Sequence, residues 1–394
     1  MSKRQREAGE EFMTPKGVKA VVLPERSERG KVLARLSCSM AGCEETHVRE
    51  SSDWHQSHTC RTHSRGSAAK VKPKATTPEA TRKRVAVAPE HDWVDANALE
   101  KEIRTLHGAR GNRHFDGYAF ADYRGDKSDR GGGVVLAVAV GAGPVRLLQG
   151  VSSRKSLSAA LLNILKIANE SDRRVLFGQD HQYGIPLALG RELGLPTDWR
   201  AAMRELFATG PFSRAAQASD AGRFASEVNA WLLDRGDQPY FWSATNGPRY
   251  GIPNTSPRPT THPTVKRLTE TKKGFPLCRI GDPGTVGGQS IVGIPRLLDL
   301  LQDCEREGIA VALWPFDGLR LDELNGHVAI EPYPSHVREK GLVQTDENDA
   351  VASTAWAQHH DENGTLERQL DLGALTPRDR DRVRFEGWIA GLLP

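Results

Sequence analysis

Residues 131–186 read GGGVVLAVAVGAGPVRLLQGVSSRKSLSAALLNILKIANESDRRVLFGQDHQYGIP. The segment opens with two apolar, β-branched runs separated by glycines, which is the pattern of buried strands joined by turns. A longer stretch with apolar residues at helical spacing follows, and a last apolar run leads into Asp180 and a Gly/Pro turn. We therefore predict two strands, a helix and a further strand.

An additional strand is predicted just before this segment. The sequence HFDGYAFADYRG, residues 114–125, alternates in strand fashion and ends at Asp122. Three consecutive strands, a helix and another strand form an α/β unit. The helix is expected at about residues 156–172, with Ser156 or Ser158 as its cap.

The remaining chain continues this α/β pattern. Residues 190–245 read as mostly helical, and residues 246–275 are rich in Pro, Thr and basic residues, as in a loop outside the core. Further helices are predicted at 93–107, 291–308, 347–360 and 379–394, and further strands at 309–318 and 326–335. The predicted fold class is a mixed α/β sheet flanked by helices.

Composition excludes several classes of protein. The chain has 394 residues, of which 38% are hydrophobic and 26% charged, so most of it is expected to be globular. The charged N-terminus has no apolar signal region, and the longest uncharged run is too short and glycine-rich to span a bilayer. We therefore expect a cytoplasmic protein with no membrane partner. The net charge of +4 permits a polyanionic partner without requiring one.

The sequence divides into four predicted parts. Residues 1–29 are polar and predict a flexible leader, and residues 30–66 contain a Cys/His cluster. Residues 67–91 mix Gly, Pro, Ala, Thr and basic side chains, which is typical of a linker. Residues 92–394 form the predicted α/β domain, with an insertion at about 190–275.

The Cys/His cluster predicts a structural zinc module. Two close pairs of potential ligands separated by a loop suit tetrahedral Zn²⁺, and a region this small needs a metal to supply stability. The predicted ligands are Cys38, Cys43, Cys60 and His63, with His47, His55 and His58 as alternatives for the fourth position. The alternative interpretation is a Cys/His-rich segment without a metal. Nearby arginines would suit nucleic-acid backbone contacts, although many such modules bind proteins.

Acidic residues occur where strands end and where a helix begins. Asp122 and Asp180 end two early strands, Glu331 ends a late strand, and Asp349 opens the helix that follows it, with Asp346 nearby. Strand C-termini and helix N-termini meet at one edge of an open α/β sheet. Carboxylates gathered there would suit Mg²⁺ or Mn²⁺, which prefer oxygen ligands, and two such ions can promote phosphodiester cleavage.

Each acid also has a structural interpretation. Asp is favoured at helix N-termini for capping and in the turns that follow strands. Asp116 and Asp126 compete with Asp122 for the role at the first strand, and His181 is either a proton carrier, a phosphate contact or a hydrogen-bonded turn residue. The order of all four acids therefore carries more information than any one of them.

The ordered motifs resemble a known superfamily over residues 112–394. The four motifs are FADYRG with Asp122, VLFGQDHQYGIP with Asp180, VAIEPYPS with Glu331 and DENDAVASTAWA with Asp349. In this order they resemble the RNase H-like superfamily, and within it a domain-of-unknown-function family of predicted nucleases on the resolvase side. The resemblance implies metal-dependent cleavage of DNA or RNA, with these four residues as ligands of catalytic Mg²⁺ or Mn²⁺.

Two other functions remain open. A non-catalytic nucleic-acid-binding or adaptor protein would use the zinc module and the basic linker, and a protein-contact scaffold would carry the acids incidentally. Aromatic residues near basic ones in the insertion are also candidates for stacking bases and holding phosphates. These are Tyr240, Phe241, Trp242, Tyr250, Arg249, Lys266, Arg267, Lys272 and Lys273.

Overall fold

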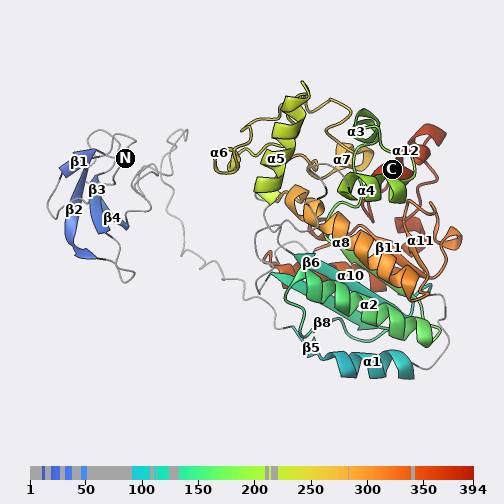
Figure 1. Cartoon of the computed structure of the whole chain (residues 1–394). Helices are drawn as coiled ribbons and strands as arrows, with labels where there is room; N and C mark the ends of the chain where they lie inside the picture. The colour runs from blue at the N-terminus through green and yellow to red at the C-terminus, as the bar shows by residue number, and fades with distance from the viewer. Residues whose placement is uncertain are drawn as a thin grey trace, which may run out of the picture. The chain divides into compact units, whose positions relative to one another are not determined.

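The structure is a computed structural model of the chain (Figure 1). It describes residues 91–106, 111, 113–123, 133–208, 213, 221–282, 284–338 and 342–394, together with the backbone of four strands before residue 51. The chain divides into two compact units, Met1–Lys83 and Arg84–Pro394. Each unit is described by itself.

The first unit contains a four-stranded antiparallel sheet in the order β1-β2-β3-β4. Its strands are β1 Glu11–Met13, β2 Lys19–Arg26, β3 Val32–Ser37 and β4 Thr46–Glu50. Two of them lie within residues 1–29, where the sequence predicts a flexible leader. The difference arises because strand pairing, which a polar composition does not reveal, joins β2 to β3. The predicted zinc ligands Cys38, Cys43, Cys60 and His63 lie outside the described residues.

The second unit is built on a mixed seven-stranded sheet in the order β10-β11-β9-β6-β7-β8-β5. Its strands are β5 Trp93–Val94, β6 Gly117–Tyr123, β7 Val134–Val140, β8 Arg146–Leu148, β9 Val175–Gln179, β10 Val311–Leu313 and β11 His327–Ile330. β6, β7 and β8 are antiparallel neighbours, whereas β6, β9, β11 and β10 run parallel. The predicted α/β class with a mixed sheet flanked by helices is confirmed.

Helices cover the sheet and form the insertion. They are α1 Ala96–Thr105, α2 Arg154–Glu170, α3 Leu187–Glu192, α4 Trp199–Ala208, α5 Ala221–Asp234, α6 Gly247–Tyr250, α7 Leu268–Lys272, α8 Gly287–Arg306, α9 Pro334–Val337, α10 Asp346–Glu362, α11 Leu366–Gln369 and α12 Pro377–Glu386. The cap of α2 is Ser153 rather than Ser156 or Ser158, because Ser153 and Ser156 form a reciprocal capping box. Among the described helices, none has both the length and the apolar character needed to cross a membrane.

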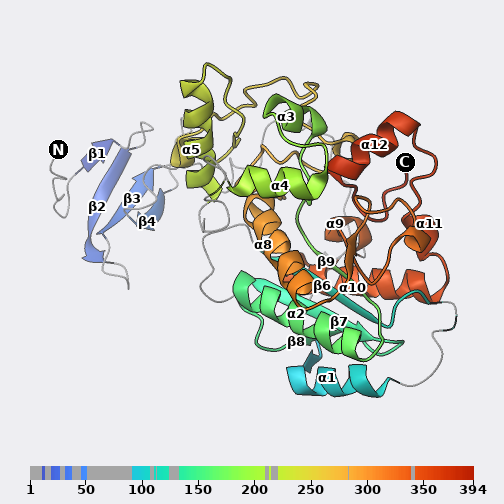
Figure 2. The ribbon, with the colours of Figure 1, turned by 45° about the vertical axis from the view of Figure 1, so that its right-hand side comes forward.

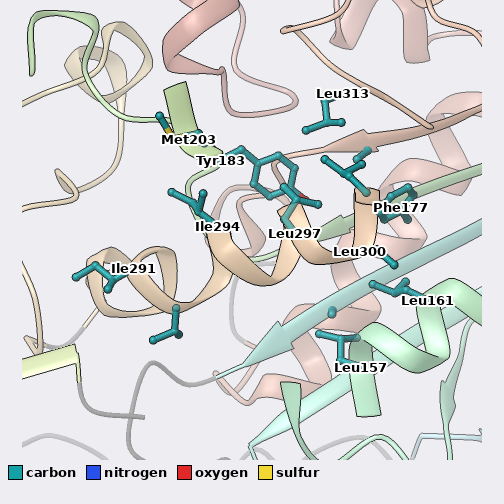
Figure 3. Packing of buried hydrophobic residues seen from close by; sticks show 14 of the residues in the cluster. Leu157, Leu161, Phe177, Tyr183, Met203, Ile291, Ile294, Leu297, Leu300 and Leu313 are labelled. Carbon is teal, nitrogen blue, oxygen red and sulfur yellow. The ribbon is translucent and has the colours of Figure 1, made fainter. Parts of the chain in front are cut away.

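One face of the sheet is covered by α2 and α8, which lie side by side (Figures 1 and 2). Figure 3 shows Leu157 and Leu161 of α2 near Phe177 of β9 and the apolar side of α8. The α8 residues Ile294 and Leu297 are fully buried. Burying a side chain of this size stabilises the folded state by about 1.5–3 kcal/mol.

The opposite face is covered by α10, which packs on β6 and β7. Small residues make this close approach possible: Ala350 is buried with Val135 and Ala137, and Ala357 is fully buried. The hydroxyl of Thr354 donates to the carbonyl of Ala137 at 3.3 Å. The small side chains of this helix therefore bring its N-terminal turn towards the ends of the central strands.

Candidate active site

The register of the central strands places two of the predicted acids next to each other. β6 and β9 pair in parallel with Ala121 opposite Gln179, so Asp122 and Asp180 follow as the next pair. The amide of Asp180 donates to the carbonyl of Ala121 at 2.9 Å, which extends the pairing to the acids. These are carboxyl ends of parallel strands, where α/β proteins commonly place their sites.

The side-chain alternation of β6 turns Asp122 towards α10. Tyr118 and Phe120 are buried in the cluster that contains Ala357 of α10. Side chains two residues apart on a strand share a face, so Asp122 lies on the same side as these aromatic rings. Asp122 is itself buried, with 5% of its surface exposed.

The acidic side chains around Asp180 change its pKa. Burial raises the pKa of Asp180 to about 7, and repulsion from Asp349 is the next largest cause. Interaction with the side chain of Asp122 opposes this rise, while Glu331 and Asp346 add smaller repulsions. The acids therefore interact electrostatically across the strand ends.

Asp349 reaches this region from the first turn of α10. Thr345 caps the helix and accepts from the amide of Asn348 at 3.1 Å. Asp349 is 5% exposed and accepts a hydrogen bond from Nη1 of Arg338. Burial raises the pKa of Asp349, and Arg338 opposes that effect. We call Asp122, Asp180 and Asp349 the strand-end cluster.

Glu331 is placed differently, although it also ends a parallel strand. Arg267 donates from Nη2 to Oε1 at 2.6 Å and from Nη1 to Oε2 at 2.7 Å. The amide of Tyr183 donates to Oε2 at 3.0 Å. Both oxygens of Glu331 are therefore occupied by donors of the chain, and the carboxylate fixes the segment that follows Asp180.

Arg267 also neutralises a second buried acid. Its Nε donates to Oε1 of Glu270 at 2.7 Å, and its amide donates to Oε2 of the same residue at 3.0 Å. Burial raises the pKa of Glu270 to about 7 against the opposing charge of Arg267. Arg267 is fully buried, and the favourable contacts of both carboxylates raise its pKa. We call Arg267, Glu270 and Glu331 the arginine network.

The structure assigns packing roles to two other candidates. His181 is 1% exposed, its Nδ1 lies 2.8 Å from the carbonyl oxygen of Gln182, and burial lowers its pKa to about 4. A neutral, enclosed ring at pH 7 fits the turn interpretation better than a cationic phosphate contact. Asp116 accepts from the amide of Arg174 at 2.9 Å at the other end of β6, and Asp126 lies outside the described residues.

Three of the nine aromatic and basic residues predicted in the insertion to contact nucleic acid are buried, namely Tyr240, Phe241 and Arg267. Tyr240 and Phe241 are buried in the main core, with 2% and 0% exposed. Arg267 belongs to the arginine network. The prediction that these residues contact nucleic acid is therefore wrong for Tyr240, Phe241 and Arg267, because all three are buried. Lys273 is exposed.

The four predicted acids thus separate into two groups. Asp122, Asp180 and Asp349 come together electrostatically, whereas Glu331 joins Arg267. Within the described residues, no group of three or more His, Cys, Asp or Glu side chains is arranged to hold a metal ion. Asp349 of the strand-end cluster is instead paired with Arg338.

Neither Arg338 nor the role of Arg267 was predicted from the sequence. Arg338 lies in the same segment as Glu331 and Asp349, eleven residues before the acid it contacts. A basic residue between two acids of one motif is a signal of this pairing, although a weak one. Arg267 lies 64 residues from Glu331, and no local pattern links them.

Comparison with known proteins identifies no relative. Neither a family model, nor a curated protein, nor a solved structure matches this chain.

Proposed function

We propose that the second unit is a metal-dependent nuclease that hydrolyses phosphodiester bonds of DNA or RNA. The observation that carries this proposal is the strand register that places Asp122 and Asp180 next to each other at adjacent strand ends, with Asp349 close enough to raise the pKa of Asp180. Carboxylates that repel one another at a sheet edge form an oxygen-rich site suited to divalent cations.

The donor set fits Mg²⁺ or Mn²⁺ better than a softer metal. The strand-end cluster offers carboxylate oxygens only, and hard cations prefer such ligands. We propose Asp122, Asp180 and Asp349 as the ligands, with Asp349 released from Arg338 when the metal binds. When bound, one or two such ions would supply an activated water and stabilise the leaving oxygen.

Glu331 belongs to the same motif order but is proposed here as a positioning residue. It accepts from the amide of Tyr183, three residues after Asp180, and from Arg267. These contacts fix the turn that follows β9 and thereby orient Asp180. The four-residue ligand set implied by the RNase H-like resemblance is therefore reduced to three ligands, and Glu331 positions one of them, Asp180.

The fold supports the RNase H-like proposal at a coarser level. Three antiparallel strands, β6, β7 and β8, are followed by α2 and by β9, which returns beside β6 in parallel. The acids lie where that order of elements predicts. The zinc module and its role in contacting nucleic acid stay predictions.

The test is cleavage of labelled single-stranded and duplex DNA and RNA by the full chain with Mg²⁺ or Mn²⁺. Asp180→Asn and Asp349→Asn should reduce cleavage by at least about 100-fold, because each removes charge that holds the catalytic ion. Asp299→Asn, which changes an exposed acid on α8, is the matched control and should cleave normally.

A second measurement separates catalysis from metal binding. Titration calorimetry with Mn²⁺ should show binding to the chain that Asp180→Asn weakens strongly and Asp299→Asn does not. Cleavage that survives Asp180→Asn would refute the assignment. If the chain binds nucleic acid but shows neither cleavage nor Mn²⁺ binding at this site, the non-catalytic alternative is favoured.

A further inference from the structure

One pocket is lined both by Asp180 of the strand-end cluster and by aromatic side chains. Asp180, Phe275 and Tyr333 line the same pocket. Phe275 is one of the exposed large hydrophobic residues of the chain, with 37% of its surface accessible. A partly exposed aromatic ring next to a candidate catalytic acid suggests a binding role, because burying the ring would stabilise the fold.

The ring of Phe275 is held in place rather than loose. The guanidinium of Arg279 lies 4.7 Å from the centre of the Phe275 ring and 5.1 Å from that of Trp242, so the cation is in contact with both aromatic rings. Nε of Arg279 also donates to Asp282 at 2.8 Å. The partly exposed aromatic surface is therefore backed by a fixed cation.

The backbone at Phe275 is tied to the segment that carries Asp180. Nε2 of Gln182 donates to the carbonyl of Phe275 at 2.8 Å and also to Glu270. Gln182 follows Asp180 by two residues. The acid and the aromatic ring are thus connected through one side chain to the buried arginine network, which fixes their relative positions.

A positive charge lies on the same rim. Nζ of Lys273 is 5.5 Å from the centre of the Tyr333 ring and 3.0 Å from Nδ1 of His336. Nε2 of His336 lies 3.3 Å from the carbonyl oxygen of Gly391, so the ring donates there and accepts from Lys273. Tyr333 and His336 therefore position an exposed ammonium group near the pocket.

We propose that Phe275 and Lys273 form a nucleotide subsite, in which an unpaired base stacks on Phe275 and a backbone phosphate pairs with Lys273. This inference rests on the proposed function and names its substrate class as single-stranded nucleic acid. Bases of a duplex are stacked on their own neighbours, so only an unpaired base offers its face to a protein ring. Every base has such a face, so the subsite has little sequence preference.

Binding in an Asp180→Asn background of the full chain tests this subsite without cleavage. Fluorescence anisotropy with labelled oligothymidylate, oligouridylate and a duplex of equal length should show tighter binding of both single strands than of the duplex. Phe275→Ala should weaken single-strand binding by about 5- to 100-fold, the range for loss of one stacked base. Lys273→Ala should lower the dependence of log Kd on log salt by about 0.7, the value for one phosphate contact of a single strand.

Matched variants control for folding and for general charge. Leu233→Ala removes an exposed apolar side chain from α5, and Lys101→Ala removes an exposed charge from α1. Neither should change binding of the single strand by more than about twofold, since general surface changes alter few phosphate contacts. Phe275→Trp restores a stacking ring and should bind like the parent, which separates loss of stacking from loss of fold.

Cross-linking places the bound strand on the chain. Oligonucleotides containing 4-thiothymidine or 4-thiouridine should cross-link to the peptide that contains Lys273 and Phe275, and the two arms show whether DNA or RNA is preferred. Equal binding of duplex and single strand, unchanged binding by Phe275→Ala, or cross-links only before residue 91 would each overturn the subsite. A chain that binds in this way but never cleaves would instead refute the proposed nuclease activity alone.

Discussion

Asp122 and Asp180 lie next to each other at the ends of two paired strands, whereas one strand further along the same sheet Glu331 is held by both terminal nitrogens of Arg267. Asp122, Asp180 and Glu331 all follow the carboxyl ends of parallel strands. Burial and repulsion from Asp349 raise the pKa of Asp180, whereas the buried cation Arg267 neutralises the charge of Glu331. Position in the fold alone therefore does not make an acid a candidate metal ligand. The side chain that it contacts decides whether its oxygens are available.

The difference has an energetic reason. A buried carboxylate loses its hydration, and this cost is offset only by hydrogen bonds and an opposite charge of good geometry. The arginine network satisfies that condition, so its carboxylates are stable in the folded chain without an ion from solution. On the proposed function, a cation from solution would offset the repulsion that Asp349 exerts on Asp180 in the strand-end cluster. The proposed site is thus a region where stability is lower until a ligand binds.

The largest expected effect comes from breaking the arginine network. Arg267→Met keeps much of the side-chain length but leaves Glu270 and Glu331 buried without their cation. The free energy of unfolding should fall by about 3–5 kcal/mol at pH 7.5, the usual cost of removing one partner from a buried pair. Chemical denaturation followed by tryptophan fluorescence measures this, since the second unit contains seven of the eight tryptophans.

An exposed ion pair provides the control for that prediction. Arg296 and Asp299 lie 3.4 Å apart on the surface of α8, with 34% and 54% of their side chains exposed. Arg296→Ala should cost less than about 1 kcal/mol. Similar losses for Arg267→Met and Arg296→Ala would show that the network does not stabilise the fold as described.

The next effect concerns pH and the strand-end cluster. The folded pKa of Asp180, about 7, lies above the ordinary Asp value of 3.8. The folded state therefore binds the proton more tightly, and stability contributed by protonated Asp180 is present below pH 4 and is lost as pH rises to 7. Asp180→Asn lacks this loss, so in buffers depleted of divalent cations it should be more stable than the parent at pH 8 by about 1–3 kcal/mol.

Comparison of the two proteins at pH 5 and pH 8 isolates this contribution. Glu270 also has a pKa raised to about 7, but it is present in both chains and cancels in the difference. Addition of Mg²⁺ at pH 8 should stabilise the parent and leave Asp180→Asn nearly unchanged. A difference in stability that does not vary with pH would mean that Asp180 is ionised in the folded state throughout, contrary to the repulsion inferred here.

The smallest effect is expected at Arg338. This arginine contacts Asp349 where a metal would need the same oxygen, so the two cations compete. Arg338→Ala should increase the affinity for Mn²⁺ by up to about 10-fold, equivalent to about 1.4 kcal/mol. Titration calorimetry measures the change, with Arg320→Ala, an exposed arginine paired with Asp322, as the control for net charge. Weaker Mn²⁺ binding by Arg338→Ala would show that the arginine supports the site instead.

Local patterns in the sequence determined the α/β class, the order of strands and helices, and the location of acids at strand and helix ends. Hydrophobic periodicity and turn residues are properties of neighbouring residues, so the strand before Asp180 and the small-residue helix after Asp349 were predictable. The same local reasoning failed for β1 and β2, which depend on pairing within a sheet, and for Tyr240 and Phe241, whose burial depends on packing against α5 and the core.

Only the tertiary structure decided which acids meet one another and which meet an arginine. Asp122 and Asp180 are 58 positions apart in the numbering, and Arg267 reaches Glu331 from a segment that reads as an exposed basic loop. Charges interact through space over a few ångströms, and the strength of the interaction depends on burial. Spacing along the chain therefore carries little information about the distance between two charges or about their burial. The chemistry proposed here for the strand-end cluster, and the nucleotide subsite beside it, follow from that spatial arrangement.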